Sequence, residues 1–180
     1  MTAGEVIATG RRSRSTDGGV AYFVYANGHY PAAALTESVA FLQNRGLRIA
    51  GLIERNKEPS RHSHCDMELE DIATGRRISI AEDRGQAATA CRLDLSGLAL
   101  AYAAVKANFA AADLVVVSKF GKTEAEGGGL RGLVAEAMEA QVPVLVGLPE
   151  RCLSAWMDFA GEYGRPLQLN GAALYRWLAA

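Results

Sequence analysis

The feature that most constrains the fold is a repeated alternation of short apolar runs with helical segments. The run VAYFVYA (20–26) has the β-branched and aromatic content of a buried strand. AAALTESVAFLQNRG (32–46) then places apolar residues at helical spacing, and LRIAGLIE (47–54) is a second apolar run. Because a strand, helix and strand at this spacing form a right-handed crossover, the first 54 residues predict the start of a parallel sheet.

The alternation resumes in the second half of the chain. Further strands are expected at LVVVS (114–118), VPVLVGL (142–148) and PLQL (166–169). Further helices are expected at 92–112, 130–140, 153–161 and 173–180. The pattern predicts an α/β three-layer sandwich with a mostly parallel sheet of about five strands.

A different pattern interrupts this alternation at about residues 55–85. Within it, MELEDIATGRRISIAED (67–83) contains two alternating runs joined by ATGR, which is typical of a β-hairpin. We therefore expect a mobile tail at residues 1–19, rich in Arg, Ser and Gly, and one α/β domain at 20–180 that carries a hairpin insertion.

Composition excludes several classes of partner. The 180 residues carry a formal net charge of -1, so no overall positive field attracts nucleic acid. The chain has neither the apolar run of a secretory signal nor about 18 consecutive apolar residues, so we expect a cytoplasmic protein without membrane insertion. Four aromatic residues of the last two expected helices predict core packing or, alternatively, a homodimer contact: Trp156, Phe159, Tyr175 and Trp177.

Ligands of open parallel sheets bind beyond the carboxyl ends of the strands, and the first loop there is ANGHYP (26–31). A phosphate-binding loop of the form G-x-x-x-x-G-K-[ST] would occupy this place, but neither the lysine nor the hydroxyl residue follows Gly28. The start of the next helix can still attract an anion, with Asn27, Gly28, His29 and Tyr30 as candidate contacts. The alternative is an ordinary Asn-Gly turn.

The loop SKFGKTEAEGGGLR (118–131) follows the third expected parallel strand. Its positive side chains surround glycines that allow close backbone approach to a ligand, which indicates an oxyanion or phosphate cradle. The alternative is a solvated, charge-balanced loop. The candidate ligand-binding residues here are Lys119, Gly121, Lys122, Glu124 and Arg131.

Catalysis of phosphate transfer has weaker support in the same loop. A phosphate-hydrolysing protein usually ends this strand in an acid that holds Mg²⁺, and Ser118 and Lys119 stand there instead. An active nucleoside triphosphatase would need Lys119 or Lys122 as its phosphate-binding lysine and Glu124 or Glu126 as its Mg²⁺ ligand. The sequence therefore favours binding over turnover and assigns no catalytic residue.

A third candidate site is RHSHCD (61–66), a cluster of imidazole and thiol groups of the kind that bind zinc. Its spacing matches no standard zinc finger, so a polar loop is the alternative. The possible metal ligands are His62, His64, Cys65 and Cys91.

Three segments, in order, carry a resemblance to a known family: HCDMELEDIATGRRISI, CRLD, and KFGKTEAEGGGLR followed by VPVLVGLPER. They resemble a bacterial domain-of-unknown-function family, number 2478, often encoded near molybdate transport genes and distantly similar to small P-loop nucleoside triphosphatases. In those enzymes a strand ends in a segment like DEIGKMEL, and SKFGKTEA is similar to it. The resemblance covers about residues 20–159 and implies a P-loop-like sandwich that handles molybdate or a similar oxyanion.

Three hypotheses follow. The leading one is a degenerate P-loop-like protein that binds an anionic ligand, either a nucleotide with Mg²⁺ or an oxyanion such as molybdate. The others are an active nucleoside triphosphatase and a non-catalytic protein-interaction module. For the first, we expect Lys119 or Lys122 to face the start of the helix near Pro31.

Overall fold

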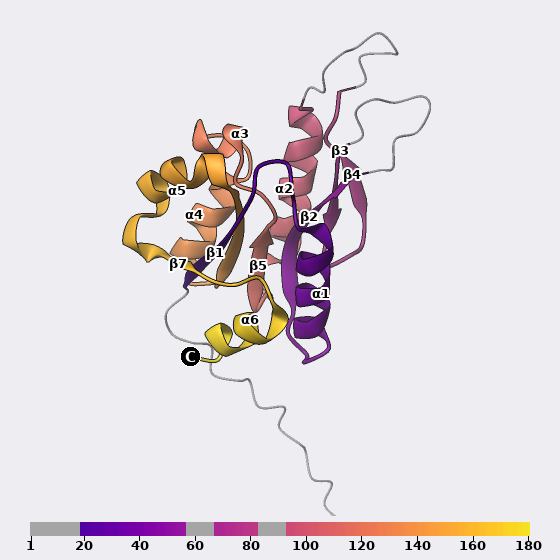
Figure 1. Ribbon diagram of the computed structural model, residues 1–180. Coiled ribbons are helices and arrows are strands. Elements are labelled where there is room, and N and C mark those ends of the chain that lie inside the picture. Colours follow the sequence, from indigo (N-terminus) through magenta and orange to yellow (C-terminus); the bar gives the residue numbers. More distant parts are fainter. Residues whose placement is uncertain (1–18, 57–66, 83–92) are drawn as a thin grey trace, which may run out of the picture.

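The computed structural model describes residues 19–56, 67–82 and 93–180 (Figure 1). The predicted N-terminal tail lies outside the described residues apart from its last residue, Gly19. The four possible metal ligands at residues 62, 64, 65 and 91 also lie outside them.

A seven-stranded sheet forms the centre of the molecule, with the order β4-β3-β2-β5-β6-β1-β7. The strands are β1 (Val20–Tyr25), β2 (Ile49–Asn56), β3 (Met67–Asp71), β4 (Arg77–Ser79), β5 (Leu114–Val117), β6 (Val144–Pro149) and β7 (Gly164–Pro166). Five neighbouring strands from β2 to β7 run parallel, whereas β3 and β4 are antiparallel to their neighbours. The prediction of about five parallel strands with a hairpin is confirmed, and the hairpin widens the sheet at its β2 side.

Helices cover both faces of this sheet (Figure 1). They are α1 (Ala32–Gln43), α2 (Leu95–Phe109), α3 (Lys122–Ala125), α4 (Arg131–Glu139), α5 (Leu153–Ala160) and α6 (Gly171–Leu178), with short 3-10 turns at Glu150–Cys152 and Gly161–Tyr163. One buried cluster joins α1 and α6 to the sheet, and a larger one joins α2, α4 and α5 to the opposite face. The predicted three-layer sandwich is confirmed.

The central strands explain why the sequence reads as uninterrupted apolar runs there. Every residue of β5 and of β6 is buried, as both faces of a parallel sheet are covered by helices. Gly147 lets β6 approach the end of β5, because a Cβ built at this position would lie 2.2 Å from the Ser118 carbonyl oxygen. The backbone N–H of Phe120 donates to the Gly147 carbonyl oxygen at 2.8 Å and holds this close approach.

The hairpin turn is organised by a buried acid. The Asp71 carboxylate accepts hydrogen bonds from the Thr74 hydroxyl at 2.6 Å and from the Ala73 backbone N–H at 3.2 Å. Gly75 adopts a φ of 72° in the same turn. The segment predicted as a turn, ATGR, therefore is one, and α2 packs against β3 and β4 behind it.

Two local predictions are wrong. The last strand is Gly164–Pro166 rather than 166–169, and it pairs with the first three residues of β1. Gly164 allows close packing here, because a Cβ at this position would lie only 3.1 Å from Trp156 Nε1. The position of β7 therefore depends on its backbone contact with β1 rather than on alternation of its side chains. The glycine loop also contains the short helix α3, which the prediction did not include.

The aromatic residues of α5 and α6 pack into or against the two buried clusters rather than forming one exposed surface, and three of the four are half-buried. Trp156 is completely buried, and Phe159 packs against the same cluster. Tyr175 and Trp177 pack against the opposite face of the sheet. Core packing is confirmed for these residues, and the homodimer stays a prediction.

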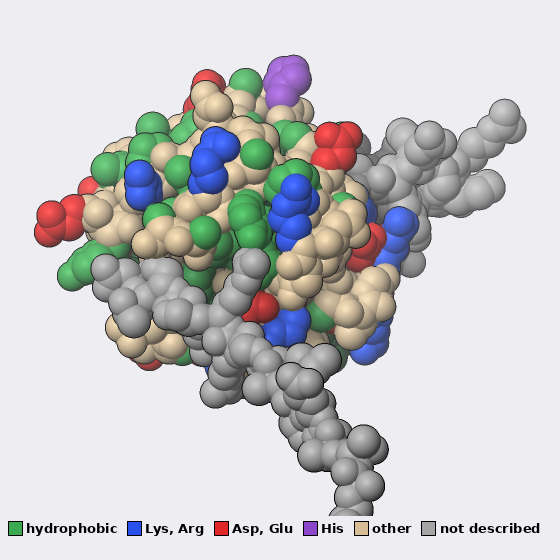
Figure 2. Space-filling view, turned by 90° about the horizontal axis from the view of Figure 1, so that it is seen from below, with side chains coloured by type: hydrophobic (Ala, Val, Ile, Leu, Met, Phe, Trp, Pro, Cys, Tyr) green, Lys and Arg blue, Asp and Glu red, His purple; other side chains and the backbone are tan. Residues whose placement is uncertain are grey.

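Surface charge is dispersed on the face that Figure 2 shows. Lys and Arg side chains stand apart from one another there, and some of them lie beside Asp or Glu. Across the described parts of the chain, no helix combines the length and apolar character needed to cross a membrane.

Candidate functional site

The carboxyl ends of the parallel strands meet at one edge of the sheet, which we call the carboxyl edge. A cavity of about 470 Å³ opens there beside the ends of β2 and β5 and the segment after β6. Its polar lining consists mainly of Glu54, Ser118, Lys119, Lys122, Glu124 and Arg151. Three of these side chains are cationic and two are acidic. The charge that the site offers to a ligand therefore depends on whether the two acids are already paired within the protein.

The loop after β5 is anchored by Phe120. Its side chain is completely buried, stacks on Phe159 and meets Trp156 edge-on with ring centroids 5.2 Å apart. Lys119 and Gly121, on either side of this anchor, both line the cavity. An aromatic pair of this kind contributes about 0.5–1.5 kcal/mol beyond the burial of its area.

Glu124 ties the two ends of the glycine loop together. Its carboxylate accepts the backbone N–H of Gly121 at 2.8 Å and that of Leu130 at 2.9 Å, one on each oxygen. Gly129 adopts a φ of 58°, and a Cβ there would lie 2.0 Å from the Glu124 carboxylate. The glycines therefore make room for a buried acid that closes the loop, and both oxygens of this acid already serve the backbone.

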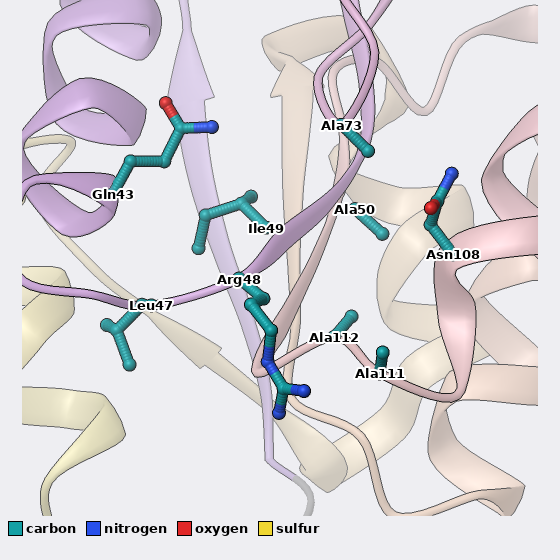
Figure 3. Close-up of a pocket in the computed structure, with 9 residues that line it drawn as sticks. All are labelled: Gln43, Leu47, Arg48, Ile49, Ala50, Ala73, Asn108, Ala111 and Ala112. Carbon is teal, nitrogen blue, oxygen red and sulfur yellow. The ribbon is translucent and has the colours of Figure 1, made fainter.

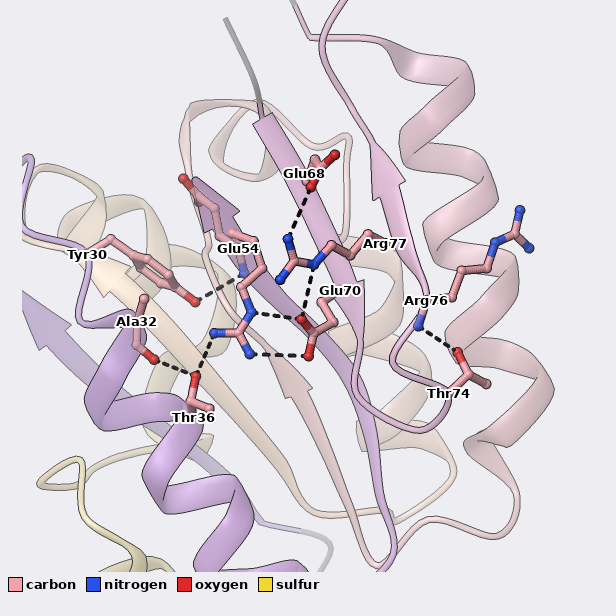
Figure 4. A network of polar contacts seen from close by, with 10 residues as sticks. Tyr30, Ala32, Thr36, Glu54, Glu68, Glu70, Thr74, Arg76 and Arg77 are labelled. Carbon is pink, nitrogen blue, oxygen red and sulfur yellow. Dashed lines mark hydrogen bonds and ion pairs between the residues drawn. The ribbon is translucent and has the colours of Figure 1, made fainter. Parts of the chain in front are cut away.

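Glu54, at the carboxyl end of β2, connects the first and third loops. Its carboxylate lies 3.3 Å from Lys119 Nζ, and its backbone N–H donates to the Tyr30 hydroxyl at 3.3 Å (Figure 4). Glu54 thus neutralises Lys119 and connects it to Tyr30. On the next residue, the Arg55 guanidinium pairs with Glu70 and donates to Thr36, which fixes β2 against β3 and α1.

Two buried hydroxyl groups at this edge make no hydrogen bond with the described residues: those of Tyr25 and Ser118. Burial raises the pKa of Tyr25, the nearby Glu54 carboxylate raises it further, and the Arg151 guanidinium partly opposes them. Burial also raises the pKa of Tyr30; the Ser118 hydroxyl lies near Tyr30, without hydrogen-bond geometry. A buried hydroxyl without a partner costs about 1–3 kcal/mol, and of these two groups Ser118 lines the cavity, where a ligand can satisfy it.

The first loop lies beside the cavity rather than in it. The Asn27 side-chain oxygen accepts the Arg151 backbone N–H at 3.2 Å, and His29 Nδ1 lies 3.1 Å from the Asn27 carbonyl oxygen. Gly28 forms the turn with a φ of 80°. Of the four candidate contacts, Tyr30 approaches the third loop through Glu54, and none lines the cavity.

The candidates of the third loop divide into two groups. Lys119, Gly121, Lys122 and Glu124 line the cavity. Arg131 instead stacks on Phe159, with its guanidinium carbon 4.3 Å from the ring centroid. Lys122 is 84% exposed and pairs with Glu126 at 3.7 Å, whereas Lys119 pairs with Glu54, which also contacts Tyr30 of the first loop.

Sequence reasoning missed Glu54 and Arg151. Both could have been found from the rule that ligands bind beyond the carboxyl ends of parallel strands. Glu54 ends the expected strand LRIAGLIE, and Arg151 lies in the segment that follows VPVLVGL. The sequence placed Tyr25 only in the first strand. The pattern of that strand, with Val24 exposed and Tyr25 buried, does not indicate that the Tyr25 hydroxyl is unpaired.

The described part of the chain contains no group of three or more His, Cys, Asp or Glu side chains placed to hold a metal ion. Its one cysteine, Cys152, is buried as a free thiol. The predicted metal cluster lies in segments that the structure does not describe, so it stays a prediction.

Residues 20–177 match the family model described as protein of unknown function (DUF2478). The chain belongs to this family. A P-loop-like fold is also found by comparison of structures: THEP1 from the hyperthermophile Aquifex aeolicus superposes with a TM-score of 0.59, covering 89% of this chain and 94% of that one, at 13% sequence identity. This likeness concerns the fold alone.

The DUF2478 chain also resembles part of a much longer protein. It is 41% identical over 137 residues to "Molybdenum import ATP-binding protein ModC 2" of Bradyrhizobium diazoefficiens. The match takes up 76% of this chain but spans only 15% of that relative.

Proposed function

We propose that this DUF2478 protein binds an anionic ligand, a nucleotide or an oxyanion such as molybdate, at the carboxyl edge, and that it acts in molybdenum handling in the cytoplasm. The observation that carries the proposal is the lining of one cavity by Lys119, Lys122, Arg151 and the buried Ser118, whose hydroxyl has no partner among the described residues. Fixed donors and cations together are the elements of an anion site.

The balance of charge in the cavity favours an anion. Glu54 is paired with Lys119, and the Glu124 carboxylate is bonded to two backbone N–H groups. Within the described residues, no acidic side chain pairs with Arg151, and the pair between Lys122 and Glu126 is solvent-exposed and weak. Arg151 and Lys122 therefore keep charge available for a ligand.

The relative from Bradyrhizobium supports the link to molybdenum. A segment similar to this chain lies within a protein named for molybdenum import and ATP binding. Segments that occur together in one polypeptide commonly serve one process, which makes molybdate a ligand to test here.

Binding rather than hydrolysis suits the residues present. The first loop lacks the lysine and hydroxyl of a phosphate-binding loop, and β5 is followed by Ser118 where an acid would hold Mg²⁺. Glu124, the nearest acid in the loop, already serves two backbone donors. With ATP and Mg²⁺ we expect phosphate release at the buffer background, and release that disappears in Lys122→Ala would contradict this.

Isothermal titration with ATP, GTP, molybdate and tungstate tests the proposal. At least one should bind, and Arg151→Gln should weaken its binding about tenfold, the effect of losing about 1.4 kcal/mol. The backbone N–H that contacts Asn27 remains in this variant, so the loop keeps its anchor.

The matched control is Arg165→Gln, an exposed arginine on the edge strand β7. It should bind like the wild type. No binding of any of the four anions, or equal loss in both variants, would remove the proposal.

A further inference from the structure

The cavity at the carboxyl edge has an apolar half that the anion alone does not explain. We propose that the ligand is an organic anion, whose charged group lies near Lys122 and Arg151 and whose apolar or heteroaromatic body lies against an aliphatic wall on the α2 side of the sheet. This inference rests on the proposed function and names the class of ligand.

Six aliphatic side chains form this wall: Met67, Leu69, Ile80, Leu93, Leu98 and Leu130. Leu69, Ile80, Leu98 and Leu130 belong to the buried cluster beneath α2, and Met67 and Leu93 pack against it half-buried. The wall is therefore a continuation of the hydrophobic core that opens into the cavity.

The size of the cavity exceeds what a bare oxyanion fills. A water molecule takes about 30 Å³, and a tetrahedral oxyanion displaces the volume of roughly two or three waters. Most of the 470 Å³ would then remain next to aliphatic side chains. Pockets for organic ligands commonly enclose about 300–1,000 Å³ and combine an apolar lining with a few polar groups.

Polar and apolar groups come from different elements. The cations and Ser118 stand on the segments that follow β5 and β6, whereas Met67, Leu69 and Ile80 come from the hairpin region. A ligand with one charged and one apolar end matches this separation, because its apolar area gains by leaving water while its charge stays at the edge. A strongly hydrated inorganic anion gains nothing from the wall.

The position of the wall also separates this site from the start of α1. Wall residues pack on the sheet face that α2 covers, whereas α1 packs on the opposite face. Asn27, Gly28 and His29 do not line the cavity. The body of the ligand therefore lies away from the place where a phosphate-binding loop would hold a nucleotide.

Titration calorimetry with inorganic phosphate, phenyl phosphate and adenosine monophosphate tests this inference. Affinity should rise along the series, with adenosine monophosphate at least tenfold tighter than phosphate. Met67→Gln should lower the affinity for adenosine monophosphate at least fivefold and change the affinity for phosphate less than twofold. The conservative Met67→Leu should keep both affinities.

Met157→Gln is the matched control, since Met157 is 45% exposed on α5 and is not among the residues that line the cavity. It should bind all three compounds like the wild type, and thermal unfolding checks that each variant is folded. If phosphate and both organic phosphates bind equally, or if Met67→Gln weakens all three alike, the apolar subsite is wrong while anion binding stands. If none of these compounds, molybdate or ATP binds, the proposed function fails and this inference with it.

Discussion

The carboxyl edge of the sheet and the opposite edge, where the parallel strands begin and which we call the amino edge, differ in how well their polar groups are paired. At the amino edge, Asp113 accepts hydrogen bonds from the Arg48 backbone N–H at 2.8 Å and from its guanidinium at 3.2 and 3.1 Å. This contact raises the pKa of Arg48. The amino-edge cavity, about 250 Å³, is lined largely by alanine and aliphatic side chains (Figure 3).

At the carboxyl edge, by contrast, Tyr25 and Ser118 keep buried hydroxyls without partners among the described residues. Among the residues that the structure describes, no acidic side chain pairs with Arg151. Groups that satisfy each other contribute to stability, whereas buried groups left unpaired lower it. Of the groups at this edge, Ser118 and Arg151 line the cavity and are available to a ligand. The comparison teaches that the edge with the poorer internal bonding is the place to look for function.

The largest expected effect comes from the packing beneath the carboxyl edge. In Gly147→Ala the new methyl group would meet the Ser118 carbonyl oxygen at 2.2 Å and the Phe23 ring at 2.8 Å. We expect the free energy of unfolding to fall by about 4 kcal/mol, since neither neighbour can move without disturbing the sheet. Urea denaturation measures it.

The control at the other edge is Gly46→Ala, in the turn between α1 and β2. Gly46 has a φ of 79° and no atom within 4 Å of a built Cβ, so only backbone strain of about 1 kcal/mol is expected. Equal losses in the two variants would contradict the view that close strand packing defines the carboxyl edge.

Next in size is Glu124→Ala. Without the carboxylate, the N–H groups of Gly121 and Leu130 lose their partner, and we expect unfolding to become easier by about 2 kcal/mol. Glu126→Ala, which removes only an exposed pair with Lys122, should change stability by less than about 0.5 kcal/mol. If Glu124→Ala leaves the free energy of unfolding unchanged, this acid does not close the loop.

A smaller loss is expected at the amino edge. Asp113→Ala should cost about 1 kcal/mol, because the backbone N–H of Arg48 loses its acceptor while the exposed ion pair contributes little. Asp113→Asn keeps an oxygen acceptor and should recover much of the loss. If the asparagine variant is as unstable as the alanine variant, charge rather than the backbone hydrogen bond holds this edge.

Tyr25→Phe should have the smallest effect, and of opposite sign. It removes a buried hydroxyl without a partner, so stability should rise by up to about 1 kcal/mol. Tyr102→Phe is the control, since the Tyr102 hydroxyl donates to Glu136 and its loss should destabilise. Destabilisation by Tyr25→Phe would mean that this hydroxyl is satisfied in the folded protein.

The same tyrosines predict a dependence on alkaline pH. Burial, followed by the bond to Glu136, raises the pKa of Tyr102 from 10.0 to about 12, and burial raises that of Tyr25 as well. The folded state then holds protons that the unfolded state releases, so this contribution is complete below pH 10 and is lost as the pH rises towards 12 and beyond. The unfolding free energy should fall above pH 10, and less steeply in Tyr25→Phe.

Most elements of the fold were predictable because local patterns report burial. Strands β1 and β5 read as apolar runs because helices cover both of their faces, and the ATGR turn contains Gly75 and follows Asp71 closely in the sequence. The strand predicted at 166–169 failed because β7 is selected by backbone contact with β1 and by the small size of Gly164. Alternation within a sequence carries no record of such a contact.

The candidate site was predictable in part for the same reason. The loop at 118–131 could be placed at the carboxyl edge from the order of elements, and four of its candidates line the cavity. The use of Glu124 as a backbone acceptor could not be foreseen, because its partners, Gly121 and Leu130, are brought to it by the fold of the loop.

The sequence by itself determined the succession of strands and helices, the parallel crossovers and the loss of the phosphate-binding lysine, since each depends on residues close together in the chain. Only the tertiary structure decided that β2 lies beside β5, so that Glu54 pairs with Lys119 across 65 positions of sequence. It also decided that the hairpin and α2 form an aliphatic wall next to those charges. Strand order and side-chain pairing arise from long-range packing, in which many weak contacts act together, and no short stretch of sequence encodes them alone.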